Sequence, residues 1–147
     1  MTEPRDPEFE RRVRDSFVRQ RFMTTLGATL DLVRAGEVHI AFAHREDLTQ
    51  QHGYLHAGVL ASVADSACGY AALSMMEPGT GVLSVEFKIN MLAPAAGTRF
   101  IAIGRVVRSG RTITVCSGEV RAEGGTSPVA LMQATMMAVR GREGVSD

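Results

Sequence analysis

The spacing of hydrophobic residues changes along the chain, from a helical period near its start to strict alternation near its end. Within residues 1–26 the spacing predicts an amphipathic helix. Asp6 is the expected N-cap, Pro7 suits the first helical position, and Gly27 is typical of a helix end. The apolar stripe of this helix consists of Phe9, Val13, Phe17, Phe22 and Leu26.

Residues 29–42 predict a β-hairpin. Segments 29–33 and 37–42 flank Arg34-Ala35-Gly36, and a glycine in so short a connection is typical of a hairpin turn. Because side chains alternate between the two faces of a strand, five residues are expected to face the core: Leu30, Leu32, Val38, Ile40 and Phe42.

A long apolar segment follows, and Asp65 is its distinguishing residue. Between positions 48 and 76 Asp65 is the only carboxylate, and Lys and Arg are absent. From His56 onward the segment is rich in small and apolar residues, which predicts a buried helix that is too interrupted by Ser, Asp and Gly to span a membrane. Burying an isolated carboxylate is costly, so Asp65 is a candidate functional residue.

The rest of the chain predicts strands. Glu77-Pro78-Gly79 ends the helix, and the four segments that follow are 83–91, 99–107, 112–122 and 129–139. The first alternates strictly, with Leu83 to Met91 at odd positions apolar. Residues 141–147 are expected to be a frayed tail.

This order of elements predicts an α+β fold in a single domain, 1–147. We expect one strongly curved antiparallel sheet wrapped around the long central helix, with an extra N-terminal helix. A formal net charge of zero argues against a nucleic-acid partner or an acidic membrane surface. Cys68 and Cys116 lack metal-ligand spacing and are interpreted as buried free thiols, so neither a metal nor a cofactor is predicted. The N-terminal residues alternate acids and bases, unlike a signal peptide, which makes the cytoplasm the default location.

The start of the central helix carries a specific motif. It runs Gln50-x-x-Gly53-x-Leu55-His56-Ala57-Gly58, with Asp65 and Gly69 further along. This pattern resembles the central motif of the hotdog-fold thioesterases, and most closely the phenylacetic-acid-type (PaaI-like) branch of the 4-hydroxybenzoyl-CoA thioesterase superfamily. The likeness extends over roughly residues 29–140, but only 50–69 is specific. The family usually has Asn in place of Gln50 and Gly in place of Ala57.

The resemblance implies hydrolysis of an acyl-CoA thioester to a free acid and CoA. The N–H of Ala57 would polarise the thioester carbonyl, since a helix start stabilises developing negative charge. Asp65 would act as a general base on water or as a nucleophile. Ser84 matches a position that helps to hold the water. The alternative for Asp65 is a buried acid that is bonded to backbone. The alternative for Ser84 is an ordinary polar residue of a strand.

The same resemblance gives roles to further residues near the motif, and position and residue type suggest roles for two arginines and three methionines. His56 would orient the helix start or contact substrate, or alternatively cap or pack the helix. Gln50 would replace the family's Asn or serve only its loop, and Gly58 would contribute to substrate binding. Arg108 and Arg111 are candidate ligands of CoA phosphates, the alternative being solvated turn residues. Three methionines would line an acyl pocket or pack in the core: Met75, Met76 and Met91.

The spacing between His56 and Asp65 predicts a shared site. Nine residues on a helix correspond to about half a turn out of phase and about 13.5 Å along the axis. One thioester carbonyl cannot meet both from the same helix. If both take part, the site combines Asp65 of one subunit with the helix start of another. A homodimer with shared active sites is therefore predicted, and the resemblance adds a homotetramer as a further possibility.

Two other functions stay open at this point. A non-catalytic protein that binds or senses acyl-CoA on the same fold is the alternative from another class, because the motif departs from the family at Gln50 and Ala57. An acyl-carrier thioester hydrolase or a dehydratase is a third, although the dehydratases have Glu where Asp65 stands. The acyl group itself is not predicted.

Overall fold

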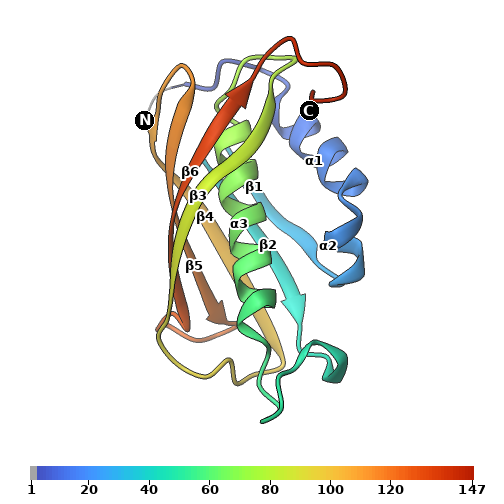
Figure 1. Cartoon of the computed structure of the whole chain (residues 1–147), viewed down its shortest axis with the longest axis vertical. Coiled ribbons are helices and arrows are strands. Elements are labelled where there is room, and N and C mark those ends of the chain that lie inside the picture. Colours follow the sequence, from blue (N-terminus) through green and yellow to red (C-terminus); the bar gives the residue numbers. More distant parts are fainter. Residues whose placement is uncertain (1–2) are drawn as a thin grey trace.

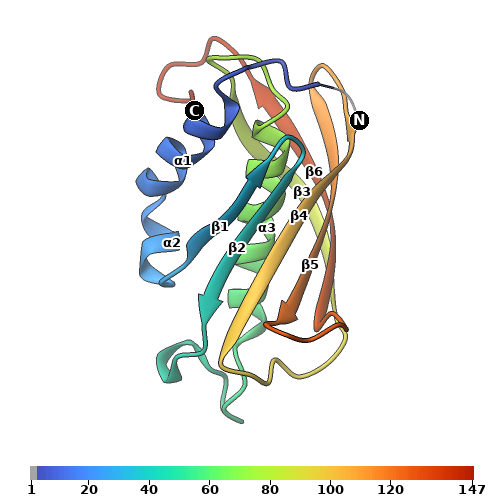
Figure 2. The ribbon, with the colours of Figure 1, turned by 180° about the vertical axis from the view of Figure 1, so that it is seen from behind.

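The computed structural model describes residues 3–147, in which a six-stranded antiparallel sheet curls around one long helix (Figures 1 and 2). The strand order is β1-β2-β4-β5-β6-β3, which confirms the predicted α+β architecture. The elements are α1 (Phe9–Arg19), α2 (Arg21–Thr25), β1 (Thr29–Arg34), β2 (Glu37–Ala43), the short 3₁₀ helix η1 (Glu46–Leu48), α3 (Ala57–Leu73), β3 (Gly81–Met91), β4 (Arg99–Ser109), β5 (Ile113–Ala122) and β6 (Ala130–Val139).

Helix α3 lies unusually close to the middle of the sheet because two facing strands carry glycine there. A Cβ added to Gly104 of β4 would lie 2.3 Å from the backbone of Ala67, and one added to Gly118 of β5 would lie 2.9 Å from Sγ of Cys68. Glycine in a strand interior often marks such a close approach of another backbone. The small residues of α3 and these glycines therefore set the depth at which the helix is buried.

The predicted free thiols are confirmed, since Cys68 and Cys116 are unpaired and fully buried. Burial raises the pKa of the Cys116 thiol to about 12, and it also raises the pKa of Cys68. Both side chains therefore behave as small apolar groups of the core rather than as nucleophiles. Among residues 3–147, no helix is long and apolar enough to cross a membrane.

The N-terminal helix differs from the prediction because it breaks at Gln20. The backbone there is extended (φ −80°, ψ 91°), and α2 begins at the next residue. The break turns Phe22 outward, where it is 53% exposed, and Met23 is buried instead. Gly27 follows α2 with φ +67°, a conformation typical of a helix C-terminus.

The hairpin is confirmed, but a bulge changes its inward face. The register between β1 and β2 shifts between Leu30 and Leu32. An extra residue in one strand reverses the alternation beyond it. Val33 is consequently buried, whereas Leu32, which simple alternation places in the core, is only partly buried.

The C-terminal residues pack against the domain, so the expectation of a frayed tail is wrong. Val145 lies directly over Gly81, where a Cβ on the glycine would meet Cγ1 of Val145 at 2.7 Å. The Asp147 carboxylate accepts hydrogen bonds from the Ser16 hydroxyl (2.7 Å) and from the N–H of Val82 (3.2 Å). These contacts tie the tail to both α1 and the start of β3.

Arg12, which forms a buried ion pair, joins α1 to the end of α3. Arg12 pairs with Asp6 at 2.8 Å, and both side chains are largely buried. The Arg12 guanidinium also donates to the carbonyls of Leu73, Met76 and Glu77. These are carbonyls at and beyond the C-terminus of α3, where a helix lacks internal donors and carries partial negative charge. The predicted N-cap at Asp6, with Pro7 as the first helical residue, is wrong, because α1 begins at Phe9 and its N-cap is Glu8. Asp6 instead pairs with Arg12, and its carboxylate accepts the N–H of Glu8.

We expect Arg12→Ala to lower the free energy of unfolding by about 3–5 kcal/mol, because the change leaves Asp6 and several carbonyls buried without a partner. Arg11→Ala on the same helix is the matched control, since Arg11 forms only an exposed pair with Glu8. It should change stability by about 0.5 kcal/mol or less. Denaturant unfolding of both variants measures the difference, and equal losses would refute a special role for Arg12.

Candidate active site

Asp65 and Ser84 form the chemical centre of the candidate site. Asp65 lies on α3 and Ser84 on β3, and the serine hydroxyl donates a 2.7 Å hydrogen bond to Oδ1 of the carboxylate. Within the described part of the chain Asp65 forms no ion pair. Burial raises the pKa of Asp65 above its ordinary value, while the bond from Ser84 opposes part of that shift. The result is a half-buried carboxylate suited to accept a proton.

A β-bulge in β3 is what directs Ser84 toward Asp65. The register between β3 and β6 pairs Ser84 with Met136 but Phe87 with Ala134, so one extra residue lies between them. Met136 and Ala134 are two positions apart in β6 and both are buried, so their partners Ser84 and Phe87 share the face toward α3. Simple alternation along β3 would place Ser84 and Phe87 on opposite faces. The sequence pattern alone therefore did not predict this geometry.

Asp65 and Ser84 border a hollow of about 120 Å³ between α1, α3, β3 and the tail. Its other walls are mostly polar, and apart from Gly69 of the motif the sequence analysis did not single out the residues that form them. They have no shared motif spacing, since they come from four separate parts of the chain that only the fold brings together. The lining residues are Ser16, Gln20, Asp65, Ser66, Gly69, Tyr70, Val82, Ser84 and Asp147.

The start of α3 presents one free backbone donor. His56 is the N-cap, and its Nδ1 accepts the N–H of Gly58 at 2.8 Å. The carbonyl of His56 accepts the N–H of Val59. The N–H of Ala57 has no acceptor within residues 3–147. His56 thus has the capping role that was left open, and Ala57 offers the predicted donor at a positive helix end.

A second hollow, of about 420 Å³, surrounds this helix start. Gln50 borders it, but the side-chain oxygen of Gln50 accepts the N–H of His52 and so serves its own loop. Met91 also borders the hollow, whereas Met75 and Met76 are buried in the core. The lining residues are Gln50, Tyr54, Leu55, Ala57, Leu60, Met91, Leu92, Ala93, Pro94 and Ala95.

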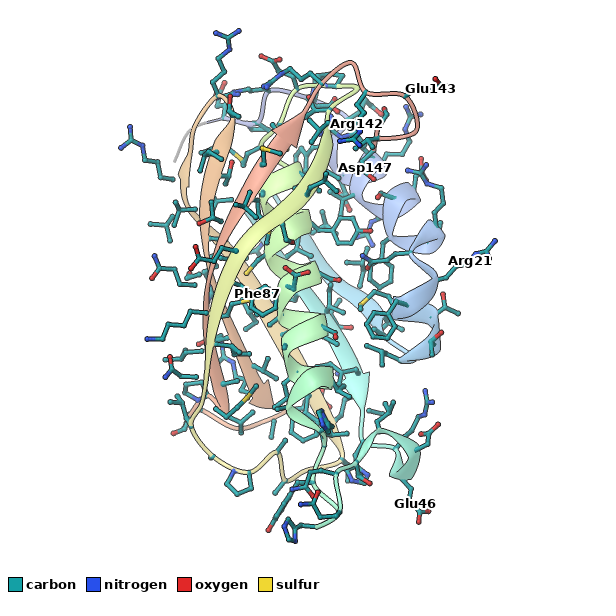
Figure 3. The ribbon with its side chains drawn as sticks, viewed as in Figure 1. Arg21, Glu46, Phe87, Arg142, Glu143 and Asp147 are labelled. Atoms are coloured by element: carbon teal, nitrogen blue, oxygen red, sulfur yellow. The ribbon has the colours of Figure 1, made fainter. Side chains whose placement is uncertain are left out.

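Within one chain Asp65 and the start of α3 are separate. Asp65 and Ala57 border different hollows, and eight residues of helix place them about 12 Å apart along the axis of α3. Both hollows lie along β3, which is an edge strand of the sheet. Phe87 lies on β3 beside α3, between the two ends of the strand (Figure 3).

The two arginines proposed for CoA phosphates do not reach either hollow. Arg108 pairs with Val115 on the outer face of the sheet, and Arg111 lies in the connection between β4 and β5. That connection is at the end of the molecule away from the start of α3 (Figure 1). In one chain, therefore, neither arginine joins the candidate site.

Comparison with known proteins identifies the family. A model of the thioesterase superfamily matches residues 52–129. A crystal structure of a thioesterase family protein from Silicibacter pomeroyi is 49% identical, with a TM-score of 0.88 over 90% of this chain and 99% of that one. The chain belongs to the thioesterase superfamily. The E. coli PaaI protein from the phenylacetic acid degradation operon shares the fold at 21% identity, with a TM-score of 0.83 over 91% of this chain and 95% of that one.

Curated relatives of this thioesterase-superfamily chain are more distant. A protein of Saccharolobus solfataricus provisionally described as an esterase is 33% identical over 86 residues, 58% of this chain and 61% of that protein. The chain therefore spans about three fifths of this relative. The 1,4-dihydroxy-2-naphthoyl-CoA hydrolase of Listeria monocytogenes is 28% identical over 91 residues, 62% of this chain and 74% of that protein. The predicted hotdog fold is confirmed by these matches and by the observed topology.

We predict that Ser84→Ala moves the acidic limb of the pH–rate profile to higher pH. Ser84 lowers the raised pKa of Asp65, so its removal raises that pKa further and leaves less carboxylate at acidic pH. The loss in kcat/KM should be larger below the wild-type limb than on the alkaline plateau. Ser117→Ala, an exposed serine in β5, is the control and should leave the limb in place. A uniform loss at every pH would show that Ser84 does not act through the charge of Asp65.

Proposed function

We propose that this protein hydrolyses an acyl-CoA thioester to a free acid and CoA, with Asp65 as the reactive carboxylate. The observation that carries the proposal is an unpaired, half-buried carboxylate held by a serine hydroxyl. Membership of the thioesterase superfamily supports the reaction class. The free N–H at the start of α3 supplies the second requirement of thioester hydrolysis, a donor for the carbonyl oxygen.

In the proposed reaction Asp65 takes a proton from a water that Ser84 helps to hold. The water oxygen bonds to the thioester carbon, and negative charge develops on the carbonyl oxygen near the N–H of Ala57. Collapse of this intermediate breaks the carbon–sulfur bond, and the CoA thiolate leaves and takes a proton. In the other route Asp65 itself attacks, forming an anhydride that water then hydrolyses. Both routes need Asp65 in its ionised form.

We propose a homodimer that joins the two hollows across β3. The β3 edge carries several large apolar side chains that are between 41% and 56% exposed, including Val85, Phe87 and Met91. An exposed apolar edge strand is a template for pairing with another chain. Antiparallel pairing of two copies about an axis at Lys88 would set Ser84 of one copy opposite Met91 of the other, because the bulge adds one residue between Ser84 and Glu86. Each Asp65 hollow would then meet the helix start of the second copy, and both sites would form at once.

In the proposed dimer each site takes residues from both subunits. Asp65 and Ser84 would act from one subunit, and Ala57, with Gly58 beside it, would act from the other. His56 holds the helix start in place through its cap to Gly58. In the dimer, the end of the molecule that carries Arg108 and Arg111 would also turn toward the partner's helix start. Their contact with CoA phosphates stays a prediction, as do the tetramer and the cytoplasmic location.

Asp65→Asn should lower turnover by at least about 10²-fold while making the fold more stable at neutral pH. The activity loss follows from removing the base. The stability gain follows because the folded state raises the pKa of Asp65, so the ionised form destabilises the native protein once the pH exceeds that pKa. The gain in Tm should shrink as the pH falls toward the ordinary aspartate pKa. CoA release and thermal unfolding across pH measure the two effects.

Asp15→Asn is the matched control for this prediction, since Asp15 is exposed on α1. It should change neither turnover nor the pH dependence of Tm. An Asp65→Asn protein that keeps more than about a tenth of wild-type turnover would remove Asp65 from the reaction. A wild-type protein that binds CoA esters without turning over any would support the binding or sensing function instead.

A mixing experiment tests the shared site. Ala57→Pro removes the proposed N–H donor at the first helical position, where proline is tolerated. His56 already has φ −61° and ψ 139°, the conformation favoured before proline. The variant should lose about 10²–10³-fold in kcat, whereas Ala57→Ser, which keeps the N–H, should stay active.

Refolding Ala57→Pro together with Asp65→Asn should restore activity. Each mixed dimer has one site with both defects and one site with none. If association is random, half of the dimers are mixed, so the sample should recover roughly a quarter of the wild-type rate. No recovery, with mixed dimers shown by mass spectrometry of differently tagged chains, would place both groups in the same subunit's site.

A further inference from the structure

The hollow beside Asp65 has a polar wall whose hydrogen bonds are mostly made within the chain. The wall consists of Ser16, Gln20, Ser66, Tyr70 and Asp147, which α1, the break after it, α3 and the tail contribute. Asp147 lies next to α1 at the upper end of the molecule (Figure 3). A molecule in the hollow is oriented by those groups of the wall that still have a hydrogen to donate.

One side of the wall has no hydrogen to spare. The Ser16 hydroxyl donates its only hydrogen to the Asp147 carboxylate at 2.7 Å. Ser16 also lies 3.3 Å from the Tyr70 hydroxyl, so in that contact Tyr70 is the donor. Ser16, Tyr70 and Asp147 therefore only accept hydrogen bonds from a molecule in the hollow.

The side of the hollow that carries Asp65 also lacks a side-chain donor. The Ser84 hydroxyl lies 2.7 Å from Oδ1 of Asp65 and 3.4 Å from the sulfur of Met136, and the carboxylate is the much stronger acceptor of its hydrogen. A water between Asp65 and Ser84 is therefore held by two acceptors, which fix its hydrogens. Neither acceptor fixes the lone pairs of the water, one of which has to point at the thioester carbon for attack.

Gln20 supplies the donor that this water lacks. The Ser66 hydroxyl donates to Oε1 of Gln20 at 3.1 Å, which leaves the N–H groups of the amide without an acceptor within residues 3–147. Ser66 directly follows Asp65 on α3, and both border the hollow. In the described part of the chain, every other side-chain hydrogen around the hollow is already donated.

The hollow is also large enough for water. Its volume of about 120 Å³ is well above the roughly 15 Å³ that a polar site needs to hold one water molecule. An ordered buried water makes about three hydrogen bonds, and Asp65, Ser84 and Gln20 offer that number of partners. The remaining lone pair of the water is then free for the thioester.

We propose that the Gln20 amide positions the attacking water at Asp65 by donating an N–H to one of its lone pairs. The inference rests on the proposed thioester hydrolysis and adds a residue to it. Asp65 takes one hydrogen of this water as the water oxygen bonds to the carbonyl carbon, and the carbon–sulfur bond then breaks. In the route through an anhydride, the same water hydrolyses the anhydride.

Gln20→Leu tests this role through the separate effects on kcat, on KM and on the pH–rate profile. Loss of one donor to the water should lower kcat by about tenfold at every pH, while KM changes by less than about threefold. The acidic limb should stay in place, because only burial and Ser84 shift the pKa of Asp65. This result is the opposite of the shift expected for Ser84→Ala.

Gln20→Glu separates the donor from the bond to Ser66. Glutamate keeps an oxygen for the Ser66 hydroxyl but has no hydrogen to donate when it is ionised. Its kcat on the alkaline plateau should therefore fall by about tenfold as well. The second carboxylate beside Asp65 should also move the acidic limb to higher pH. If Gln20→Leu does not fold, Gln20→Glu carries the test.

The first turnover shows at which step the water acts. A slow first turnover of Gln20→Leu is expected where water attacks the thioester directly. Rapid release of one CoA per site, followed by the slow rate, is expected where Asp65 attacks and the water hydrolyses the anhydride. In both cases Gln20 acts on the water.

Two control variants should keep kcat within about twofold of wild type. Tyr70→Phe changes the same hollow, but it removes only an oxygen that accepts hydrogen bonds and keeps the aromatic contact with Phe17. Gln133→Leu makes the same substitution as Gln20→Leu on the exposed outer face of β6.

The outcomes separate this inference from the function on which it rests. If wild type hydrolyses acyl-CoA thioesters and both Gln20 variants keep its kcat, the positioning role is refuted while the hydrolase stands. The same conclusion follows if Tyr70→Phe loses as much as Gln20→Leu. If wild type releases CoA from no thioester in a panel from acetyl-CoA to palmitoyl-CoA and phenylacetyl-CoA, the proposed function fails and the inference fails with it.

Discussion

The close approach of α3 to the sheet is the constraint on which the rest of the structure depends. Gly104 and Gly118 allow the backbone and side chains of Ala67 and Cys68 to reach the strands. A larger side chain at either glycine would lift the helix from the sheet. With α3 at this depth, the edge strand β3 passes beside it, and Ser84 comes within hydrogen-bond distance of Asp65. The site geometry is thus a consequence of core packing.

The same packing explains why burial raises the pKa of Asp65. A helix of small residues brings no long basic side chain that could reach back to pair with the carboxylate, and only Ser84 offsets its desolvation. At the other end of α3, by contrast, the buried Arg12 satisfies the free carbonyls. The protein stabilises the end of the helix and leaves its centre electrostatically strained. Such a distribution is typical of a site where function competes with stability.

The sequence predicted the elements well, because each has a strong local signal. The period of two in residues 83–91 and the run of small residues from His56 onward were sufficient for the sheet and for α3. The local pattern failed to predict which side chains face the core wherever one residue interrupted a strand or a helix. The bulges near Asp31 and Val85 reverse alternation without any Gly or Pro to mark them. The break at Gln20 has no local signal either, since neither Gly nor Pro stands at or beside it.

The candidate site also contains some residues that the sequence predicts and some that it does not. Asp65 and Ala57 could be found from sequence because an isolated acid and a helix start are local features. The wall formed by Ser16, Gln20 and Asp147 could not, because it exists only once the first and last segments meet beside α3.

The positions of these residues separate the binding of the carbonyl oxygen from the positioning of the water. In the proposed dimer the donor for the carbonyl oxygen comes from one copy, while Asp65 and the polar wall come from the other. The wall is built from α1 and the tail, which pack against the sheet and α3 without forming part of the sheet. Substitutions at Ser16 or Gln20 change the shape and polarity of the hollow from outside the sheet, whereas the tail also holds the start of β3 through the bond from Val82 to Asp147. Such an arrangement would allow the surroundings of the water to diverge within one fold while the donor for the carbonyl oxygen stays fixed.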